Sequence, residues 1–234
     1  MPSASISALT PAHKGCAASS TCLTRRNFLK WSGIVIIAVG AGVSPVVGRT
    51  RFPICHGYLL VDTKKCQGCM TCMLACALAH EGKHNLSRAR IQVVQNPFEK
   101  YPDDTFQMQC RQCVVPACVA SCPTGALHVD TASGNVRRVD TSLCNGCEQC
   151  VTACPYTPSR IVWNAAARLS QKCDLCINTP YWNETGGPSG KKACVELCPM
   201  KAIAFTTQVP EQTDTGYRTN LRDKSWAIMG YPTD

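Results

Sequence analysis

Cysteine is the residue type with the most chemistry to offer in this chain. The sequence has 234 residues and 19 cysteines, about 8%, a level typical of chains held by cross-links or metal. Sixteen of them form four quartets: Cys66, Cys69, Cys72 and Cys76; Cys110, Cys113, Cys118 and Cys122; Cys144, Cys147, Cys150 and Cys154; and Cys173, Cys176, Cys194 and Cys198. The first and third quartets share the spacing C-x2-C-x2-C-x3-C. The second widens the middle gap to four residues, and the fourth carries a 17-residue insertion there. Cys16, Cys22 and Cys55 stand outside the pattern.

This spacing favours iron–sulfur clusters, because two or three thiolates on a tight loop can wrap three irons of one cubane. The last two cysteines of each quartet are four residues apart, so on a helix they share a face. The third then closes its own cluster and the fourth reaches a second one, as in two-cluster ferredoxins. Pro123, Pro155 and Pro199 follow three of the quartets and should interrupt a helix there. Ala77 follows the first quartet, so that helix is expected to run on through Ala79.

Three other interpretations of the cysteines are weaker. A structural zinc site usually takes its four ligands as two separated pairs, whereas two quartets place three cysteines within seven residues. A disulfide scaffold suits an exported chain, but dense quartets are a poor way to cross-link a domain of this length. Clusters that serve folding alone would not require four of them in so short a chain.

The net charge of +9 does not indicate nucleic-acid binding. All 15 acidic residues and 20 of the 24 basic ones lie after residue 48. Four oxidised clusters with their thiolates, at roughly −2 each, would make this part of the chain negative. Basic runs are limited to pairs such as Arg137-Arg138, so no nucleic-acid partner is expected. The 45% hydrophobic and 17% charged composition also excludes a disordered polar tail and a polytopic membrane protein.

Residues 1–48 are expected to be an export signal. The basic segment Thr24–Lys30 is followed by the uncharged, mostly apolar stretch Trp31–Gly48, which is the order of an export signal. Paired Arg25 and Arg26, with Phe28 and Leu29 behind them, are similar to the twin-arginine type, which exports folded proteins. A periplasmic location follows. The alternatives of a membrane span and of an uncleaved anchor that attaches the protein to the membrane stay open.

The segments between the quartets predict an α+β fold. Short strands are expected at 58–61, 126–129, 136–139, 160–163 and 202–205. The turn at 131–135 should join two of them into a hairpin. The repeated unit is a cluster loop, a short helix and short strands, with clusters as much of the core. We therefore expect a cluster domain at 49–207 (quartets at 66–76, 110–122, 144–154 and 173–198) and a C-terminal tail at 208–234.

The order of the quartets, and the long gap inside the fourth, resemble the four-cluster ferredoxin-type electron-transfer subunits of the dimethyl-sulfoxide-reductase superfamily and their relatives. The resemblance covers roughly residues 57–207 and implies two pseudo-symmetric bacterial-ferredoxin-like modules with four [4Fe-4S] clusters. It also implies that the first quartet pairs with the fourth and the second with the third. The implied ligand sets are Cys66, Cys69, Cys72 and Cys198; Cys76, Cys173, Cys176 and Cys194; Cys110, Cys113, Cys118 and Cys154; and Cys122, Cys144, Cys147 and Cys150.

The segment 76–91 is also similar to ferredoxin subunits that serve tungsten aldehyde oxidoreductases and carbon monoxide dehydrogenases. His80 and His84 lie in it. They are not expected to be ligands, because every cluster already has four thiolates. A loop that contacts a partner or its own cluster is the favoured interpretation.

The resemblance implies a subunit that relays electrons and is not itself an enzyme. Its expected partners are a molybdenum- or tungsten-pterin catalytic subunit and an integral-membrane quinone-reactive subunit or a cytochrome. A free-standing soluble polyferredoxin is the alternative, and a self-contained reductase with an open iron site is a third hypothesis. The sequence has no glycine-rich dinucleotide motif and no convincing catalytic triad. Residues beside the quartets could tune potentials, although surface solvation is the favoured role for each: Lys65, Arg111, Gln112, Asn145 and Lys172.

Overall fold

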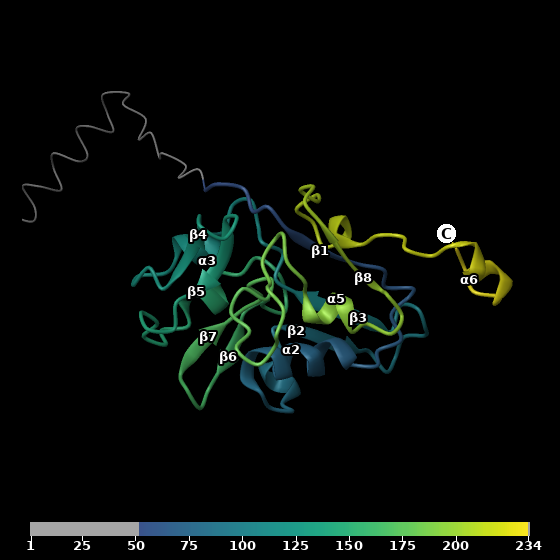
Figure 1. The fold of residues 1–234 in the computed structure, drawn as a ribbon, viewed down its shortest axis with the longest axis horizontal. Coiled ribbons are helices and arrows are strands. Elements are labelled where there is room, and N and C mark those ends of the chain that lie inside the picture. Colours follow the sequence, from purple (N-terminus) through teal and green to yellow (C-terminus); the bar gives the residue numbers. More distant parts are fainter. Residues whose placement is uncertain (1–51, 234) are drawn as a thin grey trace, which may run out of the picture. The chain divides into compact units, whose positions relative to one another are not determined.

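The computed structural model describes residues 52–233. The expected signal at 1–48, with Cys16 and Cys22, lies outside these residues. The described chain has four two-stranded antiparallel sheets with short helices between them (Figure 1). The predicted α+β, ferredoxin-like fold is confirmed. No helix among residues 52–233 is long and apolar enough to cross a membrane.

The first and last strands of the cysteine-rich region pair with each other. β1 (Tyr58–Val61) runs antiparallel to β8 (Ile203–Thr206), with Tyr58 opposite Thr206, and the two strands lie side by side in Figure 1. α2 (Thr71–Glu81) packs with α5 (Ala193–Glu196) in the same part of the fold. Quartets at opposite ends of the sequence are thereby brought into one module.

A second hairpin in this module was not predicted. β2 (Ile91–Gln95) pairs with β3 (Thr105–Gln109) after the short 3-10 helix η1 (Leu86–Arg88). β3 turns its polar residues inward: Thr105, Gln107 and Gln109 are buried, while Phe106 is on the exposed side. This inversion of the usual pattern hides the strand from an argument based on hydrophobic alternation.

The middle of the chain forms the other module. α3 (Ala117–Ala120) precedes the hairpin of β4 (Leu127–Asp130) and β5 (Val136–Val139). α4 (Gln149–Thr152) precedes the hairpin of β6 (Val162–Asn164) and β7 (Leu169–Gln171). The predicted turn between β4 and β5 is confirmed, and Gly134 and Asn135 hold it with φ of 71° and 60°, the left-handed backbone that such hairpins favour.

The expected helices differ between the quartets. α2 carries both Cys72 and Cys76 and continues to Glu81, as the absence of a proline predicts, then ends at Gly82 with φ of 65°. The other three helices are only four residues long and end before the fourth cysteine. That cysteine precedes a proline in each case, and the residue before proline is disfavoured in the helical region. A shared helical face is therefore right for the first quartet and wrong for the other three.

Residues 208–233 pack on the cluster domain and belong to the same compact unit. η2 (Thr215–Tyr217) lies against β1, and the Tyr217 hydroxyl donates to the Arg111 backbone oxygen at 2.6 Å. The buried Asp62 carboxylate accepts from the Leu221 N–H at 2.8 Å. α6 (Lys224–Ile228) follows, with Trp226 buried. This segment is thus bound to the body by specific side chains.

Candidate cluster-binding sites

The structure gathers the sixteen cysteines into four sets, which we number by their order in space. The first set is Cys66, Cys69, Cys72 and Cys198, and all four line one hollow. Burial, followed by the neighbouring sulfurs of Cys66, Cys198 and Cys69, raises the pKa of Cys72 to about 12. Three cysteines of one tight loop and one from the end of the fourth quartet therefore face a common space.

The fourth set has the same construction in the other module. The hollow of this set is lined by Cys122, Cys144, Cys147 and Cys150. Burial raises the pKa of the Cys150 thiol, and the sulfurs of Cys122 and Cys144 add to that rise. Here again one quartet supplies three thiols and another supplies the fourth.

The second and third sets lie between these two. The second set is Cys76, Cys173, Cys176 and Cys194, and burial followed by the other three sulfurs of the set raises the pKa of Cys194. The third set is Cys110, Cys113, Cys118 and Cys154. Burial and the sulfurs of Cys110, Cys113 and Cys154 raise the pKa of Cys118 to about 12, against the opposing effect of Lys172. Four thiols thus lie near one another in each of these two sets as well.

The four sets follow one another in a single series. Cys72 of the first set also contributes to the raised pKa of Cys194 in the second, and Cys110 of the third set contributes to that of Cys173 in the second. Short helical segments join the third set to the fourth, because α3 begins beside Cys118 and ends just before Cys122. Only Cys69 and Cys147 among the sixteen are exposed. They belong to the first and fourth sets, so both ends of the series reach the surface.

Left-handed backbone residues shape the cysteine loops. Gly68 and Met70 in the first loop have φ of 66° and 59°, and Gly146 and Glu148 in the third have 74° and 57°. The second quartet uses Gln112 at 48°. A non-glycine residue in this region is uncommon and marks a tightly determined turn. These turns are what allow closely spaced thiols to face one point.

Backbone N–H groups stabilise the fourth cysteine of every quartet. The donors to the sulfurs of Cys76, Cys122, Cys154 and Cys198 are the N–H groups of Arg90, Leu127, Arg160 and Ala202, at 3.2, 3.3, 3.3 and 3.3 Å. Burial opposes ionisation of Cys122, but the N–H of Leu127 and the hydroxyl of Thr124 outweigh it and lower the pKa of that thiol. A hydrogen bond of this kind favours the thiolate, which is the form that binds metal.

Buried polar atoms without protein partners surround the sets. They include the Tyr58 hydroxyl and Nε and Nη2 of Arg137. Tyr58 and Arg137 are electrostatic neighbours of each other, Tyr58 also of Cys113 in the third set. Unsatisfied buried donors are costly, and sulfide is an acceptor that could satisfy them.

The donor set fits iron–sulfur clusters. Four closely spaced thiols cannot all ionise unless positive charge compensates them, and metal supplies that charge. No group of three or more His, Cys, Asp or Glu side chains in residues 52–233 is arranged to hold a metal ion. The four thiols around a cubane each bind a different iron, so they stand farther apart than ligands of one ion. Bound clusters would supply one-electron chemistry.

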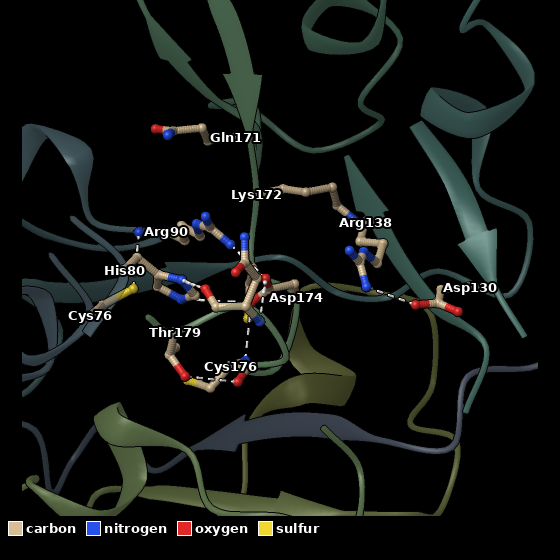
Figure 2. A network of polar contacts seen from close by, with 12 residues as sticks. Cys76, His80, Arg90, Asp130, Arg138, Gln171, Lys172, Asp174, Cys176 and Thr179 are labelled. Atoms are coloured by element: carbon tan, nitrogen blue, oxygen red, sulfur yellow. Dashed lines mark hydrogen bonds and ion pairs between the residues drawn. The ribbon is translucent and has the colours of Figure 1, made fainter. Parts of the chain in front are cut away.

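His80 lies in a polar network beside the second set, not in a ligand position (Figure 2). Its Nδ1 is 2.6 Å from the Asn178 oxygen and its Nε2 is 3.6 Å from Asp174 Oδ1, while Arg90 pairs with the other Asp174 oxygen at 2.7 Å. Burial, followed by the charge of Arg90, lowers the pKa of His80. The network ties the helix of the first quartet to the loop of the fourth. His84 is exposed.

The expectation of surface solvation is wrong for three of the tuning candidates. Arg111, Gln112 and Lys172 are 6%, 1% and 2% exposed. Burial would lower the pKa of Lys172, but the sulfurs of Cys110 and Cys118 outweigh it and raise the pKa. Lys65 is partly buried and donates to the Leu221 oxygen at 3.2 Å. Asn145 is exposed and accepts from the Cys147 N–H at 3.2 Å.

Cys55 is close to the third set but is not part of it. Its side chain is 1% exposed and its thiol donates to the Gly57 oxygen at 3.3 Å. Burial raises the pKa of this thiol, and among its electrostatic neighbours is Cys110. The sequence pattern leaves Cys55 out of the quartets, and the third set already contains four thiols without it.

Comparison with known proteins gives the same chemistry. Residues 103–208 match the 4Fe-4S dicluster domain and residues 63–79 match a 4Fe-4S binding domain. Protein NrfC homolog of Haemophilus influenzae is 33% identical over 190 residues, 79% of this chain and 80% of the relative. Protein NrfC of Escherichia coli K12 is 36% identical over 192 residues, 78% and 79% of the two chains. Hydrogenase-2 operon protein HybA of Escherichia coli O157:H7 is 28% identical over 227 residues, 87% of this chain and 68% of the relative.

Proposed function

The chain belongs to the family of 4Fe-4S dicluster ferredoxin-like proteins that includes NrfC, and from this premise we propose that it is an electron-transfer subunit with four [4Fe-4S] clusters. It is an iron–sulfur electron-transfer protein. In our proposal each of the four cysteine sets holds one cluster. The cysteines act as the iron ligands, and no other residue of the chain is a catalytic group.

The observation that carries the proposal is the assembly of four complete sets of four thiols. Each set draws three cysteines from one quartet and one from another. A backbone N–H donates to the fourth cysteine of each quartet. Such hydrogen bonds, together with burial, set the potential of an iron–sulfur cluster.

The arrangement supports a relay that begins and ends at the surface. The first and fourth sets each have an exposed cysteine, Cys69 and Cys147, while all four cysteines of the second set are buried. Electrons would enter at one of these ends and leave at the other. A partner would therefore approach the chain near Cys69 or near Cys147.

We propose that one partner is a molybdenum- or tungsten-pterin catalytic subunit. The other would be a membrane quinone-linked subunit or a cytochrome. The name of the relative HybA refers to a hydrogenase-2 operon, which supports an association with a larger redox enzyme. We favour a pterin enzyme over other partners because the quartets resemble those of subunits of the dimethyl-sulfoxide-reductase superfamily.

The protein would work in the periplasm after export of the folded, cluster-loaded chain. The basis is the Arg25-Arg26 pair and the uncharged stretch behind it. Replacing both arginines by lysine should keep the protein in the cytoplasm, as measured by fractionation of cells that produce the full chain. Normal export of this double variant would contradict the proposed route.

Cluster content tests the function and the ligand sets together. Anaerobically purified protein should contain about sixteen irons and as many labile sulfides per chain. Cys110→Ser should remove or alter one cluster in electron paramagnetic resonance spectra. Cys55→Ser is the matched control, because Cys55 is equally buried and lies near the same set. Zinc in place of iron, or loss of a cluster in the Cys55→Ser variant, would contradict the assignment.

Purification from native extract tests the relay between partners. Co-purification with a large pterin-containing subunit is the expected result. A monomer on gel filtration would favour the free-standing polyferredoxin instead. A substrate that changes the spectrum of one cluster would favour a reductase with an open iron site.

A further inference from the structure

We propose that the Lys172 ammonium raises the potentials of the two middle clusters, that of the third most strongly. The inference rests on the proposed function, since it requires clusters in the second and third sets. It assigns a positioning role to a residue that ligates nothing.

Lys172 lies between the two middle sets. It directly precedes Cys173 of the second set, and the other sulfurs with which its charge interacts include those of Cys110 and Cys118 in the third set and that of Cys55. Its side chain is 2% exposed. Figure 2 shows it extending toward the strand of Arg138, away from the network around Asp174. No acidic partner for Lys172 is found among the ion pairs of residues 52–233.

A closed ring of hydrogen bonds fixes this cation in place. Lys172 Nζ donates to the Arg137 backbone oxygen at 2.6 Å, and the Arg137 N–H donates to Gln112 Oε1 at 2.8 Å. Gln112 Nε2 donates in turn to the Cys173 oxygen at 2.8 Å. Cys173 is bonded to Lys172, which completes the ring. The Gln112 backbone also faces the third set, since its N–H is 3.4 Å from Cys110 Sγ.

Arg137, whose backbone belongs to the ring, carries a second positive charge on its side chain. Arg137 is fully buried, its Nη1 donates to the Asn135 oxygen at 2.6 Å, and its Nε and Nη2 have no protein partner. Two cations thus share a space from which water is excluded, and neither is paired with a carboxylate there. Burying unpaired charge is unfavourable, so negative charge from the thiolate-bound clusters is what balances them.

The other buried lysine beside a cluster site is satisfied differently. Lys192 donates to the Gly190 and Pro188 oxygens at 2.6 and 3.1 Å and lies over the Phe205 ring. Lys172 donates to one carbonyl oxygen, and its main electrostatic partners are the sulfurs of Cys110 and Cys118. Both charges act on cysteine sulfurs: that of Lys192 acts on the second set, and that of Lys172 acts on the third set as well.

A fixed positive charge favours the state with one more electron. Each cluster gains one negative charge on reduction, and in a water-excluded interior the attraction to a nearby cation is only weakly screened. Lys172 keeps its own proton in this step, so only an electron moves, supplied by the neighbouring cluster of the relay. The two end sets lie beyond the middle pair and should respond little.

The test is a redox titration of the full, cluster-loaded chain followed by electron paramagnetic resonance. In Lys172→Met the equilibrium constant for reduction of the third cluster should fall about tenfold, which is about 59 mV for a one-electron couple. The second cluster should shift in the same direction by less, with the first and fourth unchanged. Lys83→Met, at an exposed lysine, is the control and should match the wild type.

A second variant separates charge from structure. Lys172→Gln removes the charge but keeps an N–H donor for the Arg137 oxygen, so its potentials should fall even where Lys172→Met loses a cluster. With about sixteen irons retained, unchanged potentials in Lys172→Gln would overturn the inference while leaving the proposed function intact. Wild-type protein without clusters would instead overturn the proposed function. Equal shifts of all four clusters would also contradict a local effect of Lys172.

Discussion

The attachment of the C-terminal segment can be tested at one buried carboxylate. Asp62 is 1% exposed and accepts four hydrogen bonds. Its Oδ1 accepts from the Lys64 and Lys65 N–H groups at 3.1 and 3.2 Å, and its Oδ2 accepts from the Leu221 N–H and Arg222 Nε at 2.8 and 3.1 Å. The perturbation is Asp62→Asn, which preserves size but replaces one acceptor by a donor. The new amide N–H₂ must then face one pair of N–H donors.

The magnitude follows from the burial of both partners. The Arg222 and Asp62 side chains are 6% and 1% exposed, so this is a buried ion pair and not a surface one. Removing one partner of such a pair costs about 3–5 kcal/mol of unfolding free energy. For a chain of this size, that loss lowers the apparent unfolding midpoint by roughly 6–20 °C. Undocking of the segment should also expose Trp226, which is buried in the folded chain.

The assay combines thermal unfolding with limited proteolysis, on cluster-loaded protein under anaerobic conditions. In Asp62→Asn, cleavage after residue 208 should precede loss of the cluster absorbance. The control is Asp103→Asn, at an exposed carboxylate in a loop, which should behave as the wild type. A midpoint for Asp62→Asn within the error of that control would refute the view that Asp62 anchors the segment.

Two further changes address a glycine in the third cysteine loop and the ion pairs that Asp214 makes with Arg111 and Arg160. Gly146→Ala should lose the fourth cluster, measured as about four irons fewer per chain. The reason is that an added Cβ would lie 2.5 Å from the Arg168 oxygen, and the φ of Gly146 is 74°. Full iron content in this variant would contradict the prediction. Asp214→Asn should destabilise the chain by about 1 kcal/mol in denaturant titrations, since Asp214 bridges Arg111 and Arg160 at 3.0 Å each but is half exposed to solvent. Burial would raise the pKa of Asp214, but its bonds to the two arginines outweigh this and lower it. The difference should therefore persist at every pH above about 3.9 and disappear only as the pH falls through the lowered pKa.

Local chemistry explains which parts of the fold could be predicted from the sequence. The cysteine spacing is decided within each loop, and the β4–β5 hairpin is decided by its turn residues, so both could be predicted. The pairing of β1 with β8 joins segments more than a hundred residues apart, and no local pattern encodes it. The resemblance to a known family supplied the combination of cysteines into sets, which spacing alone left open.

The missed elements share a physical cause. In β3, Gln107 and Gln109 face inward and Phe106 faces outward, so the hydrophobic pattern is inverted. Gln112 and Lys172 are polar residues that are buried as well, although the sequence predicts both on the surface. A polar side chain is expected outside because an ordinary core offers it no partner. A core that contains thiolates and inorganic sulfide does offer partners, and the rule fails where such a core is near.

This reversal also bears on how the relay works. Burying the cations of Lys172 and Arg137 would be unfavourable in an apolar core, and negative charge on thiolate-bound clusters would offset that cost. The same donors that satisfy the cluster sites would then tune their potentials, because a hydrogen bond or a cation near sulfur stabilises the reduced state. Cluster loading and potential tuning are therefore served by one set of side chains. A substitution in this set should change a potential even when every iron remains bound.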